Sequence, residues 1–116
     1  MSGRSSKAKG YAGENAVVKW LRDNGFPYAE RRRAGASKDT GDIVGVKPGL
    51  VIEVKNHARM VLSDWVSQLR QEMNNFDPPA WSGVVLHKRK GTTDVGEWYA
   101  TMPASVWLDL IKESGY

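Results

Sequence analysis

Residues 41–55 read Gly-Asp-Ile-Val-Gly-Val-Lys-Pro-Gly-Leu-Val-Ile-Glu-Val-Lys. The runs 42–46 and 50–55 are rich in β-branched residues, and the turn residues 47–49 separate them, so the stretch predicts a β-hairpin. The second run is apolar at nearly every position, which is typical of a central strand covered on both faces. The segment therefore predicts a sheet with helices on both sides.

The rest of the chain predicts further helices and strands around this hairpin. Val17, Val18 and Leu21 share one helical face, and Asn24-Gly25 supplies a stop, so a helix is expected over about 11–24. By the same criteria we expect a strand with a basic end over 26–33, a helix over 61–75, strands over 81–87 and 98–101, and a helix over 104–113. The order α-β-β-β-α-β-β-α predicts the α/β class, with a central mixed β-sheet flanked by helices.

Length and composition limit the class of protein. A chain of 116 residues is expected to form one domain, here over 10–116, after a basic flexible tail over 1–9. The chain has no cysteine and two histidines, which excludes thiolate zinc sites, thiol nucleophiles and histidine-rich metal sites. A metal would therefore be a hard cation held by carboxylates. We expect no membrane span and no secretory signal, because no long apolar run is present.

The charge is distributed unevenly along the chain. Residues 1–60 hold 12 Lys and Arg against 6 Asp and Glu, whereas residues 61–116 hold 5 against 7. The formal net charge is +4. A basic half favours a polyanion such as nucleic acid as partner, although many small proteins are basic for solubility alone.

Several charged residues lie where the pattern calls for apolar ones. Glu53 and Lys55 share a face of the second hairpin strand, about 6.6 Å apart. Asp42 begins the neighbouring strand, and Glu14 falls on the apolar stripe of the first helix. A carboxylate that faces a core is costly unless it is paired or metal-bound. The alternative is a structural Glu53–Lys55 ion pair on a half-exposed strand.

Two carboxylates and a lysine suit the hydrolysis of a phosphodiester bond. Carboxylates hold Mg²⁺, which polarises the phosphate and activates a water molecule, and a lysine positions that water or neutralises charge on phosphorus. Asp42 and Glu53 can act together only if they face the same side of the hairpin. Residues that are directly opposite each other in the hairpin share a face, so their residue numbers must then sum to an odd value. This requires a loop with an even number of residues around Pro48, or a bulge, for example at Gly45.

These elements resemble the PD-(D/E)XK nuclease superfamily. Glu14 in the first helix, Gly41-Asp42 at a strand start and Glu53-Val54-Lys55 are similar to its acid, aspartate and E-x-K elements. The opening Lys-Gly-x-x-x-Glu helix and the serine-containing loop before Gly-Asp-Ile are most similar to archaeal-type Holliday junction resolvases. The resemblance covers about residues 9–90 and implies a restriction-endonuclease-like core. Residue 41 departs from the pattern, since it is Gly where the family name records Pro.

The resemblance implies a role for each residue of the motif. Asp42 and Glu53 would bind Mg²⁺, or Mn²⁺ in its place, together with the main-chain carbonyl of Val54. Lys55 would serve the attacking water, and Glu14 would support the metal. Such a site would belong to a Mg²⁺-dependent, structure-selective DNA endonuclease, most similar in kind to a Holliday junction resolvase.

The resemblance also implies contacts beyond these residues. Gln68 would support the active site from the second helix. DNA contacts are expected from Arg31, Arg32, Arg33, Ser37, Lys38 and Arg59. A four-way junction has two symmetric cleavage points, so a homodimer that presents one site to each is expected. The expected location is the cytoplasm of a bacterial, archaeal or phage-infected cell.

Two alternatives to a resolvase stay open. One is a nuclease of the same superfamily that acts on flap, nicked or linear DNA, or on RNA. The other is a non-catalytic DNA-binding module with the same fold. Intact Asp42, Glu53 and Lys55 favour an enzyme.

Overall fold

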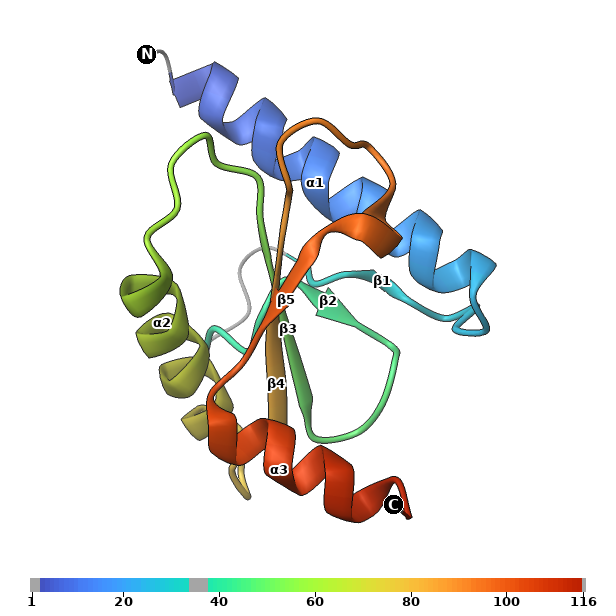
Figure 1. The fold of residues 1–116 in the computed structure, drawn as a ribbon, viewed down its shortest axis with the longest axis vertical. Helices are drawn as coiled ribbons and strands as arrows, with labels where there is room; N and C mark the ends of the chain where they lie inside the picture. The colour runs from blue at the N-terminus through green and yellow to red at the C-terminus, as the bar shows by residue number, and fades with distance from the viewer. Residues whose placement is uncertain (1–2, 34–37, 116) are drawn as a thin grey trace.

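A computed structural model describes residues 3–33 and 38–115 (Figure 1). In chain order the elements are α1 (Gly3–Asp23), β1 (Glu30–Arg31), β2 (Ile43–Val44), β3 (Leu50–Lys55), α2 (Leu62–Asn74), β4 (Ser82–His87), the 3₁₀ turn η1 (Val95–Glu97), β5 (Tyr99–Thr101) and α3 (Ala104–Glu113). The predicted order of helices and strands is confirmed, with η1 as an unpredicted addition. Within the described ranges, no helix has the length and apolar character needed to cross a membrane.

The strands form one mixed sheet in the order β1-β2-β3-β4-β5. Neighbouring strands are antiparallel except for β3 and β4, which are parallel and are connected through α2. β3 therefore lies at the centre of the sheet, as its apolar sequence predicts, and its residues from Val51 to Val54 are buried.

Helices cover both faces of the sheet, which gives three layers (Figure 1). On one face, Val17 and Leu21 of α1 pack in a cluster with Ile52 and Val54 of β3. On the other face, a second cluster joins α2, α3 and the sheet through Trp65, Leu69, Met73, Val51, Val85 and Val106. Because side chains alternate along a strand, Val51, Glu53 and Lys55 all face the α2 side.

The hairpin register agrees with the requirement derived from the sequence. Ile43 pairs with Ile52, so that paired residue numbers sum to an odd value. Asp42 directly precedes this pair, and its amide donates a hydrogen bond of 2.8 Å to the Ile52 carbonyl. Gly45, directly after β2, has a φ of 83°, a left-handed conformation that glycine adopts readily.

Several of the predicted element ends need correction. Helix α1 begins at Gly3, so residues 3–9 of the expected flexible tail are helical. No proline interrupts this segment, and the Asn56 side chain donates a hydrogen bond of 2.9 Å to the Lys9 carbonyl, which ties the first turns to the end of β3. The strand expected over 26–33 is only two residues long, because a turn closed by the Ala29 amide and the Phe26 carbonyl occupies its first half. The first hairpin run, expected over 42–46, forms a strand only over Ile43–Val44, and helix α2 begins at Leu62.

Candidate metal centre

Asp42, Glu53 and Lys55 lie together at the centre of the sheet, as predicted. Asp42 precedes β2, and one of its carboxylate oxygens, Oδ2, accepts a hydrogen bond of 2.9 Å from the Val54 amide. Lys55 Nζ lies 3.6 Å from Glu53 Oε2. The N–H and C=O of one strand residue point to the same side, so the Val54 carbonyl is also directed toward the edge of β3 that carries Asp42. The hairpin register thus brings the whole predicted motif to one place.

Two further acids complete a cluster that the motif did not include. Carboxylate oxygens of Asp39, Glu53 and Glu72 all lie within 4.8 Å of one another. Glu72 lies on the inner face of α2 and is only 2% exposed. Asp39 is half exposed and stands on the solvent side of the cluster. Among the described residues, these three acids form a grouping that could hold a metal ion, and Asp42 lies close enough to Glu53 for the two carboxylates to interact.

The sequence does contain a signal for Glu72. It lies seven positions after Trp65 and three after Leu69, on the apolar stripe of α2. A carboxylate on such a stripe is the same anomaly that singles out Glu14. Asp39 has no comparable signal, because it lies in a polar segment and reaches the cluster only through tertiary contacts.

Those contacts hold Asp39 from two sides. The Gly41 amide donates a hydrogen bond of 3.0 Å to Asp39 Oδ1, and the Asn75 side chain donates one of 2.6 Å to the Asp39 carbonyl. Gly41 has a φ of 104°, which a proline ring, fixed near −65°, cannot adopt. The backbone at residue 41 is therefore incompatible with a proline.

Burial dominates the electrostatics of the cluster. Burial raises the pKa of Glu53 to about 7, with the negative charge of Asp42 as a further cause. Burial, followed by the neighbouring Glu53, raises the pKa of Glu72 to about 11. Burial also raises the pKa of Asp42 above its ordinary value. When no metal cation is bound, the cluster therefore holds protons at neutral pH, despite the nearby Lys55 ammonium.

The cluster fits a divalent cation. Glu53 Oε1 and both carboxylate oxygens of Glu72 are buried without a hydrogen-bond partner. Buried acceptors of this kind are costly unless something satisfies them. Several carboxylate oxygens that converge on one point are the donor set of Mg²⁺ and Mn²⁺. A cation would both satisfy these oxygens and displace the protons.

Lys55 is positioned by a second side chain. Its Nζ donates a hydrogen bond of 2.7 Å to Gln68 Oε1, and the Lys55 side chain is only 15% exposed. Gln68 lies on α2 one turn before Glu72, so one helix face supplies both the holder of the lysine and an acid of the cluster. The structure thus places Gln68 next to Lys55.

Glu14 does not belong to this grouping. Arg31 Nε lies 3.0 Å from Glu14 Oε1, and the Arg31 guanidinium also stacks 4.3 Å above the Tyr11 ring. Glu14 lies on α1, which covers the face of the sheet opposite α2. Its pKa is raised mainly by burial, with the Asp42 charge as a smaller cause, so the two acids remain within electrostatic reach.

The predicted DNA-contacting residues divide into two groups. Arg31 and Arg32 are engaged within the protein, since Arg32 donates to the Gly41 carbonyl at 2.8 Å and to the Lys38 carbonyl at 3.3 Å. Arg32 therefore supports the segment that carries Asp39 and Asp42. Arg33, Lys38 and Arg59 are exposed. Ser37 lies outside the described residues.

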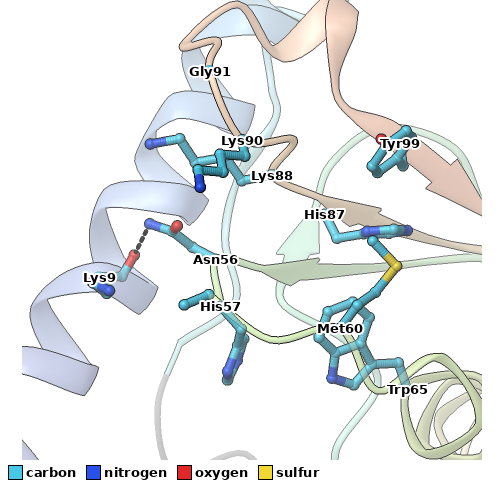
Figure 2. Close-up of a pocket in the computed structure, with 11 residues that line it drawn as sticks. Lys9, Asn56, His57, Met60, Trp65, His87, Lys88, Lys90, Gly91 and Tyr99 are labelled. Carbon is cyan, nitrogen blue, oxygen red and sulfur yellow. Dashed lines mark hydrogen bonds between the residues drawn. The ribbon is translucent and has the colours of Figure 1, made fainter. Parts of the chain in front are cut away.

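A hollow adjoins the centre beyond the end of β3. Its volume is about 600 Å³. It is lined on one side by lysines and on the other by aromatic side chains (Figure 2). The sequence motif gave no indication of it, because its lining comes from five separate segments of the chain.

Comparison with known proteins gives no match to a family model, to a curated protein or to a solved structure.

Proposed function

We propose that the protein is a divalent-cation-dependent DNA endonuclease with a restriction-endonuclease-like core. One observation carries this proposal. The hairpin brings Asp42, Glu53 and Lys55 together, which lie within 13 residues of one another in the chain. Next to them are buried carboxylate oxygens of Glu53 and Glu72 that have no hydrogen-bond partner. A structural ion pair between Glu53 and Lys55 would explain neither the unpartnered oxygens of Glu72 nor the approach of Asp39.

The acids of the cluster and Lys55 would have different roles in hydrolysis. Asp42, Glu53 and Glu72 would hold a divalent cation through their carboxylate oxygens, and Asp39 would complete the set from the solvent side. When bound, Mg²⁺ would polarise the phosphate and lower the pKa of a coordinated water. Lys55 faces the same space and can orient the attacking water or neutralise charge on phosphorus.

The side chain of Gln68 sets where the lysine acts. Its 2.7 Å hydrogen bond fixes Lys55 Nζ beside Glu53, so that the ammonium group does not sample other positions. Preorganisation of this kind costs nothing at the moment of reaction, which is why it contributes to rate. Gln68 is therefore a positioning residue.

For the substrate we propose DNA, with a four-way junction as the preferred form and a homodimer as the active species. Exposed Arg33, Lys38 and Arg59 supply positive charge for phosphates. One chain of 116 residues presents one such centre, whereas a junction needs two symmetric cuts.

The test is cleavage of a labelled four-way junction in Mg²⁺ and in EDTA, beside matched linear duplex, flap and single strand. Glu53→Gln removes a cluster carboxylate, and Glu113→Gln on the exposed end of α3 is the matched control. Paired symmetric cuts on the junction alone, lost with Glu53→Gln and kept with Glu113→Gln, would support the resolvase.

Other outcomes separate the alternatives. Equal cutting of flap or linear DNA would keep the nuclease and discard the junction as preferred substrate. Tight binding without cutting in Mg²⁺ or Mn²⁺ would refute the enzyme and leave a DNA-binding module of the same fold.

A further inference from the structure

The hollow beyond β3 has two chemically different walls (Figure 2). Lys9, Lys88 and Lys90 lie on the side of the hollow next to α1, together with Asn56, which contacts Lys9. The described residues that line the hollow include no carboxylate. This wall is therefore suited to an anion such as a phosphate group.

The opposite wall is a row of aromatic rings. The ring centroids of His57 and Trp65 are 5.7 Å apart, those of Trp65 and His87 are 5.1 Å apart, and those of His87 and Tyr99 are 5.2 Å apart. Neighbouring rings are tilted by 44° to 61°, so they are not stacked in parallel on each other. An aromatic face that is exposed to solvent can stack on a nucleobase.

The two ends of this row are the accessible ones. Trp65 and His87 are buried and support the row from within, and His87 is fixed by a 2.7 Å hydrogen bond between its Nε2 and Thr101 Oγ1. Tyr99 is 45% exposed, and His57 is exposed as well. A base entering the hollow would thus meet Tyr99 and His57 against a rigid support.

The hollow is lined by residues that are neighbours of Lys55 in the chain and in the sheet. His57 is two residues beyond Lys55, so their Cα atoms are at most about 7 Å apart. His87 is the parallel-strand partner of Lys55, and Trp65 lies one turn before Gln68 on α2. Lys55 and the aromatic wall therefore face the same side of the sheet.

The size of the hollow agrees with a small ligand. Ligand sites commonly enclose about 300–1,000 Å³. The observed volume of about 600 Å³ accommodates a nucleotide. A paired base is held inside its duplex and cannot place its face against these rings, whereas an unpaired base can.

We propose that this hollow binds one unpaired, unstacked nucleotide of the DNA strand next to the bond that is cleaved, with its base on Tyr99 and His57 and its phosphate on Lys88 and Lys90. The inference rests on the proposed nuclease function, because it places the bound strand relative to Lys55. It also predicts that an unpaired nucleotide at the branch point of a four-way junction or another branched DNA increases the affinity.

The test compares two branched DNAs that differ in one group only. Both carry one unpaired nucleotide at the branch, and in one of them this nucleotide lacks its base. Binding is measured in EDTA and again in Ca²⁺, separately from cleavage in Mg²⁺. The wild-type protein should bind the DNA with the base about 5- to 150-fold more tightly, as expected for one stacked base.

Three variants test the walls of the hollow. His57→Ala combined with Tyr99→Ala should bind both DNAs alike, whereas Tyr99→Phe should keep the preference because the ring remains. Trp107→Ala is the matched control, since Trp107 is an exposed aromatic residue of α3 away from the hollow. Circular dichroism and thermal melting should show that each variant is folded.

The lysine wall is tested by salt dependence. Lys88→Ala combined with Lys90→Ala should reduce the slope of log affinity against log salt by about 1.4 for a single strand. Lys47→Ala combined with Lys112→Ala, both exposed and outside the hollow, should leave the slope near its wild-type value.

The outcomes distinguish this proposal from the nuclease itself. Cleavage in Mg²⁺ with equal binding of the two DNAs would overturn the nucleotide site and leave the nuclease standing. A preference for the base that the double variant abolishes, without any cleavage, would support the nucleotide site and refute the nuclease. Tighter binding of a free nucleoside monophosphate than of the branched DNA would overturn the assignment to a DNA strand.

Discussion

Replacement of Glu72 by glutamine should stabilise the protein when no divalent cation is present. Folding takes the Glu72 carboxyl from its ordinary pKa of 4.5 to about 11, chiefly because the side chain is buried. At pH 8 an unfolded glutamate is ionised, whereas the folded one holds a proton. Each pKa unit between 4.5 and pH 8 corresponds to about 1.4 kcal/mol, which sums to a cost of at most ~5 kcal/mol. A neutral carboxamide of the same shape does not bear this cost.

We therefore expect Glu72→Gln to raise the stability of the cation-free protein by about 2–5 kcal/mol at pH 8, or its melting temperature by at least ~8 °C. The gain should shrink as the pH falls toward 4.5, because the unfolded carboxyl then takes up a proton as well. Addition of Mg²⁺ or Mn²⁺ should reverse the order, since the wild-type protein gains stability from a cation that the variant binds weakly.

The assay is thermal unfolding followed by circular dichroism at pH 5 and pH 8, with EDTA and with each cation. Glu113→Gln, at an exposed position of α3, is the control and should change the melting temperature little. A Glu72→Gln protein that melts at or below the wild-type temperature at pH 8 in EDTA, and that cations stabilise as much as wild type, would refute this account of the cluster.

Three further predictions concern the site and the hairpin. Lys55→Met keeps most of the apolar stem of the side chain but removes its charge. The rate of cleavage in Mg²⁺ should therefore fall at least ~100-fold, which corresponds to about 3 kcal/mol of activation free energy, while the affinity for DNA in Ca²⁺ should change only a few-fold. A variant that cleaves normally would exclude Lys55 from the chemistry. Cation binding requires the deprotonated form of Glu53, and burial raises the pKa of Glu53 to about 7, so the cleavage rate should rise as the pH increases through about 7. A rate that falls with pH between 6 and 8 would contradict this. Gly45→Ala should lower the free energy of unfolding in urea by roughly 2 kcal/mol or more, because φ is positive there and the added Cβ meets the Tyr28 carbonyl. Gly25→Ala, also at a positive φ but with open space around it, should lower it by about 1 kcal/mol. Equal losses in the two variants would contradict the clash.

The hairpin shows how much of the fold the sequence could predict. The apolar run 50–55 and the turn residues before it are local signals, and the structure confirms β3 over these residues at the centre of the sheet. The register of the two hairpin strands could also be predicted, from the single requirement that Asp42 and Glu53 share a face of the hairpin. Element ends were less certain, because the start of α1 depends on a contact between Lys9 and Asn56, which are 47 residues apart.

The candidate site could be predicted only where its residues are close in the sequence. Asp42, Glu53 and Lys55 lie on adjoining strands of one hairpin, and Gln68 follows on the next helix. Glu72 carried a signal in its place on an apolar stripe. Glu14 carried the same kind of signal, yet its helix packs on the other face, where Arg31 holds its carboxylate.

By itself, the sequence determined the alternation of helices and strands, the central position of β3 and the pairing of two acids with one lysine, because periodicity and turn chemistry act over a few residues. Only the tertiary structure decided that Asp39 and Glu72 join this centre, that Arg31 and Arg32 are engaged within the protein, and that lysines and aromatic rings from distant segments enclose a hollow beside Lys55. The physical reason is that the pKa, the burial and the partners of a side chain depend on neighbours supplied by other elements, and these neighbours are set by how whole helices pack on the two faces of the sheet.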